Sequence, residues 1–254
     1  MFKKILVSIL CIAMFISGIS SDSFSKVAVA DATTYELAED GTGGTPADYT
    51  EADGEMFLLN LFDKNVENVV VPKYVNITDW GLCPVTGISP GAFRNNKKIK
   101  TISLPYRMKE ICNNACRGCV NLQEMTFPAR LERLDARSFM GCRSMKKITF
   151  EGCKKGSQVT ELETGAFQDC TKLTKVNLPC KLKYIGEDVF KNCNNLKKIV
   201  INCPKIRKLG KGAFEGVSEE CKVYIPKSLS AFDKALYVLR LKADGIKESN
   251  IISK

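Results

Sequence analysis

Apolar residues recur along this chain at fixed distances from a phenylalanine, and the pattern repeats six times. The tripeptide Gly-Ala-Phe stands at residues 91–93, 165–167 and 212–214. With this phenylalanine as position zero, the copies step by 23, 23, 28, 23 and 24 residues and are centred on Phe93, Cys116, Phe139, Phe167, Phe190 and Phe214. A unit this short cannot bury its apolar face alone, so the repeat predicts a solenoid of stacked coils.

Each copy contains two short strand-like segments. Residues 173–179 read apolar-x-x-apolar-x-apolar-Pro, and this alternation predicts a strand that ends at Pro179. A second alternation, with apolar Leu182 and Ile185, begins the next coil. Between them, the Gly-Ala-Phe corner turns the chain with a small residue and directs a large ring inward. Equivalent residues on successive coils are expected one strand spacing apart, roughly 4.8 Å.

The order Ile-x-x-Gly-Ala-Phe-x-x-Cys-x-x-Leu-x-x-Ile-x-Leu-Pro resembles the BspA-type leucine-rich repeat of bacterial surface proteins, over residues 66–226. Together with the repeat pattern, the resemblance implies an α/β repeat solenoid dominated by short β-strands, with a parallel sheet and about six 23-residue coils. For function, it implies surface interaction and adhesion, with ligands that differ between members.

The solenoid is predicted over residues 64–226, and its first part departs from the repeat. Residues 66–72 match only the last third of a copy and predict a degenerate half-coil. Residues 74–83 are additional to the repeat and include Trp80. We interpret them as a hairpin or loop on the first coil.

After the last copy, residues 227–254 predict a C-terminal capping helix and tail. Ser228 is a suitable N-cap, and Gly245 stands where a helix is expected to stop. The face expected to cover the open end of the core consists of apolar residues at helical spacing: Phe232, Leu236 and Leu239.

Residues 1–30 predict a secretory signal peptide. Lys3 and Lys4 precede an apolar run over residues 5–19, and residues 28–30 (Ala-Val-Ala) offer a small-residue cleavage site. A retained membrane anchor is the alternative, but the run is short for a membrane span. Since no second apolar stretch follows, we expect no membrane span after signal removal. The expected location is secreted or associated with a bacterial cell surface.

The formal net charge of +10 is unevenly distributed. Residues 31–55 hold eight carboxylates and no Lys or Arg, with several glycines and few apolar residues. We therefore expect residues 31–63 to form an acidic flexible leader and an N-terminal cap. Because residues 1–30 contribute +2 and residues 31–55 contribute −8, the chain from Met56 onward carries +16.

Lysines recur seven and eight residues past the phenylalanine. Stacking would align four of them in one column beside the main strand, which we call the lysine ladder: Lys147, Lys175, Lys198 and Lys222. A neighbouring column would contain Lys100, Lys146 and Lys197. The exposed position within the strand, ten past the phenylalanine, contributes Ser103, Thr126, Thr149, Asn177, Val200 and Tyr224. These columns form the candidate ligand-binding face.

Two interpretations of this face remain open. The first is an electrostatic track for an extracellular protein or an anionic glycan, such as a sulfated glycan or a teichoic acid of the cell wall. The second is that lysines keep exposed strands soluble and prevent edge pairing, while hydroxyl groups solvate an ordinary sheet. Nucleic acid suits the sign of the charge, but export and the lack of a nucleic-acid-binding motif argue against it.

The cysteines invite a chemical interpretation that the repeat weakens. Cys112, Cys116 and Cys119 have the spacing of an iron–sulfur site, but Cys116 takes the phenylalanine position and Cys119 falls in a column with Cys142, Cys170 and Cys193. Buried free thiols, disulfides within this column or between Cys180 and Cys203, and a four-thiolate zinc site are the alternatives. The repeat favours buried thiols, and we expect no cofactor or metal.

The chain contains no histidine, which excludes Ser-His-Asp, Cys-His and His-metal sites. It also lacks a glycine-rich phosphate loop and a serine nucleophile elbow. Leader, solenoid and cap use the whole length, so no second domain is left to hold a catalytic site. We expect a binding protein, not an enzyme, and name no catalytic residue. A structural spacer without a strong ligand is the alternative, and the sequence leaves the oligomeric state open.

Overall fold

The structure is a computed structural model of the chain, and it describes residues 26–28, 47–52, 55–61, 63–77, 81–152, 156–204 and 206–254. The predicted signal peptide, apart from residues 26–28, lies outside the described residues, as do residues 31–46 of the predicted leader and Trp80.

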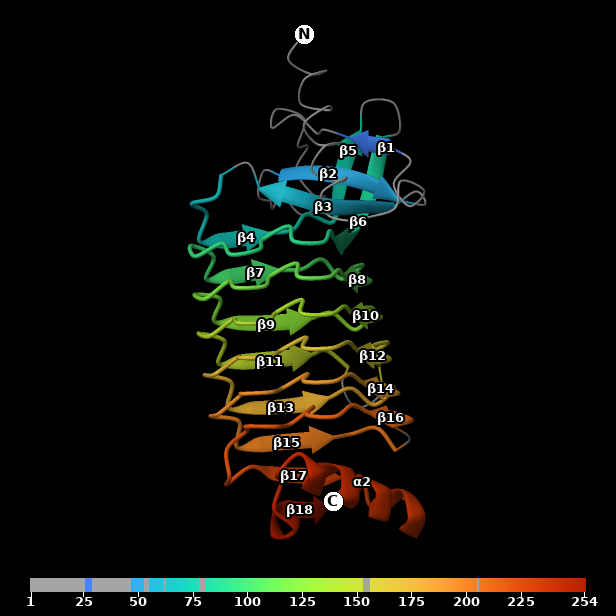
Figure 1. Ribbon diagram of the computed structural model, residues 1–254. Helices are drawn as coiled ribbons and strands as arrows, with labels where there is room; N and C mark the ends of the chain where they lie inside the picture. Colours follow the sequence, from blue (N-terminus) through green and yellow to red (C-terminus); the bar gives the residue numbers. More distant parts are fainter. Residues whose placement is uncertain are drawn as a thin grey trace.

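The described chain forms a stack of coils with one sheet along each side (Figure 1). The main sheet is parallel throughout, in the order β18-β17-β15-β13-β11-β9-β7-β4. Its strands are β4 (Asn68–Val70), β7 (Thr101–Ser103), β9 (Glu124–Phe127), β11 (Lys147–Phe150), β13 (Lys175–Leu178), β15 (Lys198–Ile201), β17 (Lys222–Ile225) and β18 (Ile251–Ser253). The predicted parallel solenoid of short strands is confirmed.

The second sheet follows the other side of the stack in the order β1-β2-β3-β6-β8-β10-β12-β14-β16, with β5 paired to β6. Most coils give it only two residues. Its strands are β1 (Lys26–Ala28), β2 (Ala47–Ala52), β3 (Glu55–Leu61), β5 (Tyr74–Ile77), β6 (Gly81–Ile88), β8 (Glu110–Ile111), β10 (Arg133–Leu134), β12 (Glu161–Leu162), β14 (Tyr184–Ile185) and β16 (Lys208–Leu209). The hairpin predicted for residues 74–83 is confirmed as β5–β6.

Two residues of every coil have left-handed backbone dihedrals, and they shape the corner around the phenylalanine. Two positions before it φ lies between 56° and 71°, and two positions after it between 59° and 75°. Glycine, asparagine or aspartate fills all these positions except one, because these residues enter this region at low steric cost. Arg137 is the exception, with φ 57°. The glycine of the repeated tripeptide is thereby explained.

The phenylalanines form a column through the core. Their rings stack with centroids 5.5–5.6 Å apart and planes within 12° of each other, in the order Phe139, Phe167, Phe190 and Phe214. Cys116 interrupts the column one coil earlier. Near this interruption, Phe127 and Phe150 of the main sheet stack at 4.9 Å, and Phe127 meets the Phe139 ring edge-on at 5.4 Å. Where Cys116 replaces the ring, phenylalanines of the main-sheet strands therefore supply the aromatic packing.

The N-terminal end of the core is covered by the antiparallel strands β2 and β3. β3 pairs with β6 of the first coil, and its Met56, Leu58 and Leu61 are buried. Within the segment predicted as acidic leader and N-terminal cap, residues 47–52 and 55–61 thus form paired strands. β3 adds to the open edge of the first coil through β6, and β2 then pairs with the outer edge of β3.

At the C-terminal end, helix α2 (Ala231–Ala243) lies across the last coil (Figure 1). Its N-cap is Ser230, whose side chain accepts a hydrogen bond from the backbone N–H of Asp233 at 3.1 Å. The predicted cap, Ser228, lies two residues too early. The helix ends before Gly245, which has φ 90°, so the predicted stop is confirmed.

The face of α2 that covers the core differs from the predicted one. Tyr237 and Leu241 are buried, whereas Phe232 and Leu239 are 77% and 66% exposed. Leu236 is half-buried. Tyr237 is preferred at the core because its hydroxyl donates to a carbonyl and accepts from an amide N–H of the last coil, each at 3.2 Å. Phenylalanine and leucine side chains cannot satisfy those backbone groups.

Asp244, directly after α2, replaces the coil that the stack lacks at this end. In the interior, the backbone N–H groups at the corner donate to carbonyls of the following coil, as Gly165 does to Glu187 at 2.8 Å. In the last coil, the N–H groups of Gly212 and Phe214 donate to the two carboxylate oxygens of Asp244, at 2.9 and 3.0 Å. The tail then adds the 3-10 turn Glu248–Asn250 and strand β18.

We expect Phe167→Ala to lower the free energy of unfolding by about 3–5 kcal/mol, because it removes a fully buried ring from the column. Phe232→Ala, measured at a chain concentration where the protein is monomeric, is the matched control, since the same truncation at an exposed position changes stability by less than about 0.5 kcal/mol. Chemical denaturation of both variants measures the difference. A loss below about 1 kcal/mol for Phe167→Ala would contradict the packed column.

Asp244→Ala should lower the free energy of unfolding by about 2 kcal/mol, because two backbone N–H groups of the last coil lose their acceptor. Asp244→Asn retains one acceptor oxygen and is expected to lose less. Denaturation curves of the two variants give the comparison. Equal losses for both, or a loss near zero for alanine, would show that the carboxylate does not close the stack.

Candidate ligand-binding face

The main sheet brings the predicted lysine ladder into register. β11 pairs with β13 through Lys147 and Lys175, β13 with β15 through Lys175 and Lys198, and β15 with β17 through Lys198 and Lys222. Towards the N-terminus the same column continues with residues that carry no positive charge. Lys147 pairs with Glu124, and Glu124 pairs with Thr101. Four consecutive lysines therefore lie one strand spacing apart, roughly 4.8 Å.

The two lysine columns differ in how their charge is compensated. In the neighbouring column, Lys100 pairs with Glu67 at 2.8 Å and Lys197 with Glu220 at 3.4 Å. Among the residues that the structure describes, no carboxylate lies within salt-bridge distance of the four ladder lysines or of Lys146. Like charges directly opposite on paired strands are destabilising, so the ladder retains uncompensated repulsion.

Shallow hollows follow the sheet beside the ladder. A hollow of about 420 Å³ is lined by Lys147, Lys175 and Asn177, together with Thr149 and the ladder's acidic neighbour, Glu124. A second, of about 590 Å³, shares Lys175 and Asn177 with the first and continues over β15 and β17. The two hollows therefore meet on β13. They form one groove along the ladder, which suits an extended ligand better than a compact one.

An aromatic side chain stands at the C-terminal end of this groove. The ring of Tyr224 has the Lys198 ammonium 4.8 Å and the Lys254 ammonium 5.7 Å from its centroid. Both distances allow a cation–π interaction. Lys254 belongs to the tail after β18 and enters the groove only because β18 joins the sheet. The repeat could not place it there, so the sequence analysis missed this residue.

The N-terminal half of the same face has a different chemistry. A hollow of about 350 Å³ over β7 and β9 is lined by Thr101, Ser103 and Thr126 together with Glu124 and Glu151. Thr126 pairs with Thr149 in the column that sequence analysis placed beside the ladder. The predicted face is thus one continuous sheet surface, hydroxylated and acidic at one end and basic at the other.

The sequence profile of the BspA type leucine-rich repeat region matches residues 86–219 and 150–243, with six copies. The chain belongs to this family. The resemblance expected from the sequence is confirmed. Among curated proteins, none matches the chain. Proteins of leucine-rich repeat families serve in general as binding scaffolds, and this repeat is characteristic of bacterial surface proteins.

Two solved structures, from T. pallidum and a pneumococcus, show the same fold at low sequence identity. A leucine-rich repeat protein of T. pallidum is similar at a TM-score of 0.60 and 20% identity, over 89% of this chain and 98% of that one. The pneumococcal vaccine antigen PcpA is similar at 0.50 and 14%, over 80% and 73% of the chains. A leucine-rich repeat protein of Bacteroides ovatus aligns with a TM-score of 0.44 and 21% identity. The alignment covers 72% of this chain and 58% of that one, so this chain spans little more than half of that protein's length.

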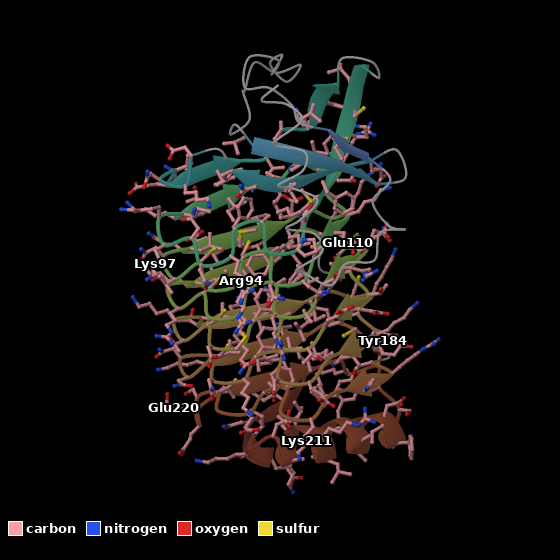
Figure 2. The ribbon with its side chains drawn as sticks, turned by 45° about the horizontal axis from the view of Figure 1, so that its top comes forward. Arg94, Lys97, Glu110, Tyr184, Lys211 and Glu220 are labelled. Carbon is pink, nitrogen blue, oxygen red and sulfur yellow. The ribbon has the colours of Figure 1, made fainter. Side chains whose placement is uncertain are left out.

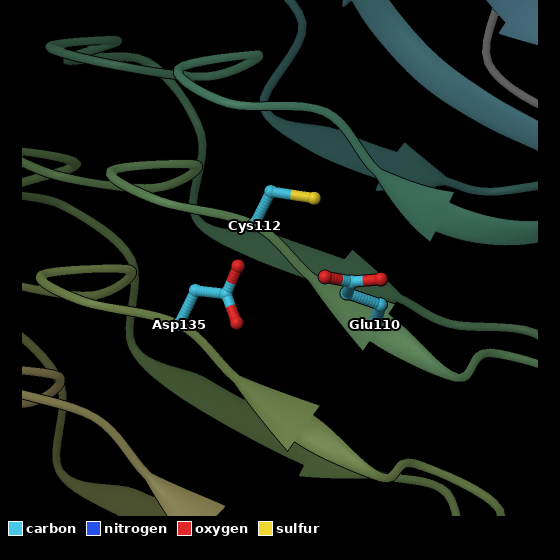
Figure 3. Close-up of side chains that lie close together, drawn as sticks. All are labelled: Glu110, Cys112 and Asp135. Carbon is cyan, nitrogen blue, oxygen red and sulfur yellow. The ribbon is translucent and has the colours of Figure 1, made fainter. Parts of the chain in front are cut away.

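Charged side chains project from the BspA-type stack on all the sides that Figure 2 displays. Glu110, Cys112 and Asp135 form one cluster on the second sheet, with ligand atoms within 4.8 Å of one another (Figure 3). Arg133 already compensates this cluster, since it lies 3.0 Å from Asp135 and 3.6 Å from Glu110. Burial raises the pKa of Asp135 above its ordinary value. We interpret the cluster as a compensated ionic network on β8 and β10.

The cysteine column is built into the core of the repeat. Its four thiols donate to backbone carbonyls of the preceding coil at 3.0–3.4 Å, from Cys119, Cys142, Cys170 and Cys193. Nine cysteines in the described part of the chain, among them Cys112, Cys180 and Cys203, are free thiols. Burial raises the pKa of the Cys142 and Cys170 thiols well above the ordinary value and that of Cys193 to about 12. Such thiols pack as small apolar groups.

Among the described residues, no helix combines the length and apolar character that a membrane span requires.

We expect Cys142 and Cys170 to stay unmodified when the folded chain meets a thiol reagent at pH 8, because burial keeps both thiols protonated. After denaturation without reductant, both should react fully. Mass spectrometry of peptides from the two samples measures this. Cysteines that remain unreactive in the denatured, unreduced sample would instead identify disulfides.

Proposed function

We propose that this chain is an exported, non-enzymatic binding protein that holds an extended anionic glycan or cell-wall polymer along the groove of its main sheet, at or near a bacterial cell surface. The observation that supports this most directly is the lysine ladder, whose four in-register lysines form no ion pair with a carboxylate among the described residues. An adhesive role follows if the polymer belongs to a cell wall or a host surface.

The argument is electrostatic. A protein that needed lysines only for solubility could pair them with acidic side chains of the adjacent coil, as Lys100 does with Glu67 and Lys197 with Glu220. The ladder instead concentrates positive charge on one line, at a cost in stability. A polymer with regularly spaced anionic groups would relieve that repulsion, because each coil presents one ammonium group at nearly constant spacing.

The groove adds shape to the charge. Its two hollows meet at Asn177, and Tyr224 presents a polar hydroxyl and an aromatic ring beside Lys198. Amide and hydroxyl groups suit the hydroxyl groups of a sugar backbone, while the ammonium groups suit its phosphate, sulfate or carboxylate substituents. An acidic segment of an extracellular protein is the competing ligand, and the experiment below includes it.

The triple variant Lys147→Glu, Lys175→Glu and Lys198→Glu is expected to abolish binding to heparin and to purified wall teichoic acid, at an unchanged melting temperature. Binding of the unmodified chain should weaken as salt rises from about 0.05 to 0.5 M, because exposed charges are screened. Surface plasmon resonance with immobilised polymer measures both. An acidic extracellular protein and neutral dextran are tested in parallel.

The matched control is Lys183→Glu, Lys208→Glu and Lys211→Glu, which changes the net charge equally but at exposed lysines outside the main sheet. It should bind nearly as well as the unmodified chain. If both triple variants lost polymer binding equally, net charge alone would explain the loss. That result would contradict a binding site on the ladder. No binding to any anionic polymer at low salt would favour a structural spacer. Binding to the acidic protein alone would replace the glycan by a protein ligand.

A further inference from the structure

Helix α2 is apolar on two opposite sides. Tyr237 and Leu241 face the core, whereas Phe232 and Leu239 face outward and are the two most exposed large apolar residues in the described part of the chain. Phe232 and Leu239 are seven residues apart, which is two helical turns, so they lie on one line along the helix. Leu236 is half-buried between them. We call these three residues the outer stripe of α2.

This outer stripe is the opposite of what a free solenoid end requires. Terminal units of repeat proteins normally present a polar outer surface, because the next coil is absent and the end meets water. The N-terminal end has a strand cover, β2–β3, and the core residues of β3 point into the stack. At the C-terminal end, α2 closes the core but places a phenylalanine and a leucine in solvent. Exposed apolar surface of this kind marks an interaction site.

The charges that flank the outer stripe are self-complementary. Asp233 and Arg240 are also seven residues apart, each one position after a stripe residue, so both lie on the same flank of the helix. In an antiparallel pair of α2 helices related by a two-fold axis, Phe232 meets Leu239 of the other copy. The same axis brings Asp233 beside Arg240 of the other copy, on the same flank. Arg240 has no carboxylate partner within the described chain.

A second feature at the same end is open to a copy of this chain. β18 is the terminal strand of the main sheet, and among the described strands none pairs with its outer edge. Its residues, Ile251, Ile252 and Ser253, include no charge or proline of the kind that normally protects an edge strand. Both β18 and α2 lie at the C-terminal end of the stack (Figure 1).

From these observations we infer that the chain self-associates end to end, as a two-fold symmetric dimer in which the outer stripes of two α2 helices pack antiparallel. A second copy is the occupant because the stripe, its flanking charges and the open edge of β18 all meet the requirement of self-complementarity. The helix is only about 20 Å long, so the contact is small and the dimer is expected to dissociate at low concentration. Dimerisation would place two lysine ladders in one assembly, which favours binding of a long polymer through avidity.

Sedimentation velocity of the chain, as exported by an expressing cell, tests the inference over about 1–300 µM. The mass is expected to rise from one chain to two across this range. The double variant Phe232→Ser and Leu239→Ser should stay monomeric at every concentration, with an unchanged melting temperature. Leu82→Ser is the matched control, since Leu82 is 56% exposed at the other end of the stack. A monomeric unmodified chain throughout the range would overturn the inference.

The charges give a test that is specific for the antiparallel arrangement. Arg240→Asp places two aspartates together at each symmetric contact and should shift dimerisation at least tenfold toward monomer. Exchanging the pair, with Asp233→Arg and Arg240→Asp together, should restore most of the dimer. Association that persists unchanged in Arg240→Asp, or that the exchange does not restore, would contradict this pairing. None of these outcomes depends on the ligand of the sheet face.

Discussion

Backbone hydrogen bonds between successive coils are the constraint on which the rest of this structure depends. Each corner donates to the next coil, and both sheets pair residue for residue, so that position zero of one coil lies above position zero of the next. The step of 28 residues between Phe139 and Phe167 shows how strict this is, because the extra residues leave the ring stack at 5.6 Å. In this longer copy, the carbonyl of Gly152 accepts from the backbone N–H groups of Gly156 and Ser157.

The same register has an electrostatic consequence. A solenoid cannot offset equivalent side chains, so four lysines at one repeat position become four neighbours at strand spacing. Where Lys100 and Lys197 stand one residue earlier, a glutamate on an adjacent coil relieves the charge. Among the described residues the four ladder lysines form no such ion pair, although Glu124 stands one coil before Lys147, and this distinguishes the ladder from an ordinary solvated face. The geometry thus turns a residue choice repeated in sequence into a continuous surface property.

The repeated part of the chain could be predicted from sequence because every repeat position occurs in several copies, and the copies can be compared. Six copies fix the phase of the core, the two sheets and the lysine ladder without knowledge of a single contact. Each end of the stack has a sequence that occurs only once, and there the predictions differ from the structure. Helical spacing alone favoured Phe232 over Tyr237, since it counts apolar area and not the unpaired backbone groups that the Tyr237 hydroxyl satisfies. Lys254 was missed for a similar reason, because its place in the groove depends on β18.

The two ends of the stack solve one problem differently. An interrupted solenoid leaves a row of backbone groups and an apolar cross-section open to water, and both must be satisfied. At the start, β3 continues the sheet and buries Met56 and Leu58. At the end, the Asp244 carboxylate takes the N–H groups of the missing coil while Tyr237 and Leu241 cover the core. Those contacts use one side of α2 only. Capping therefore does not explain why the opposite side of α2 is apolar. Because an apolar surface must be covered at a free end as it is at the core, we assign that side to a contact with another molecule.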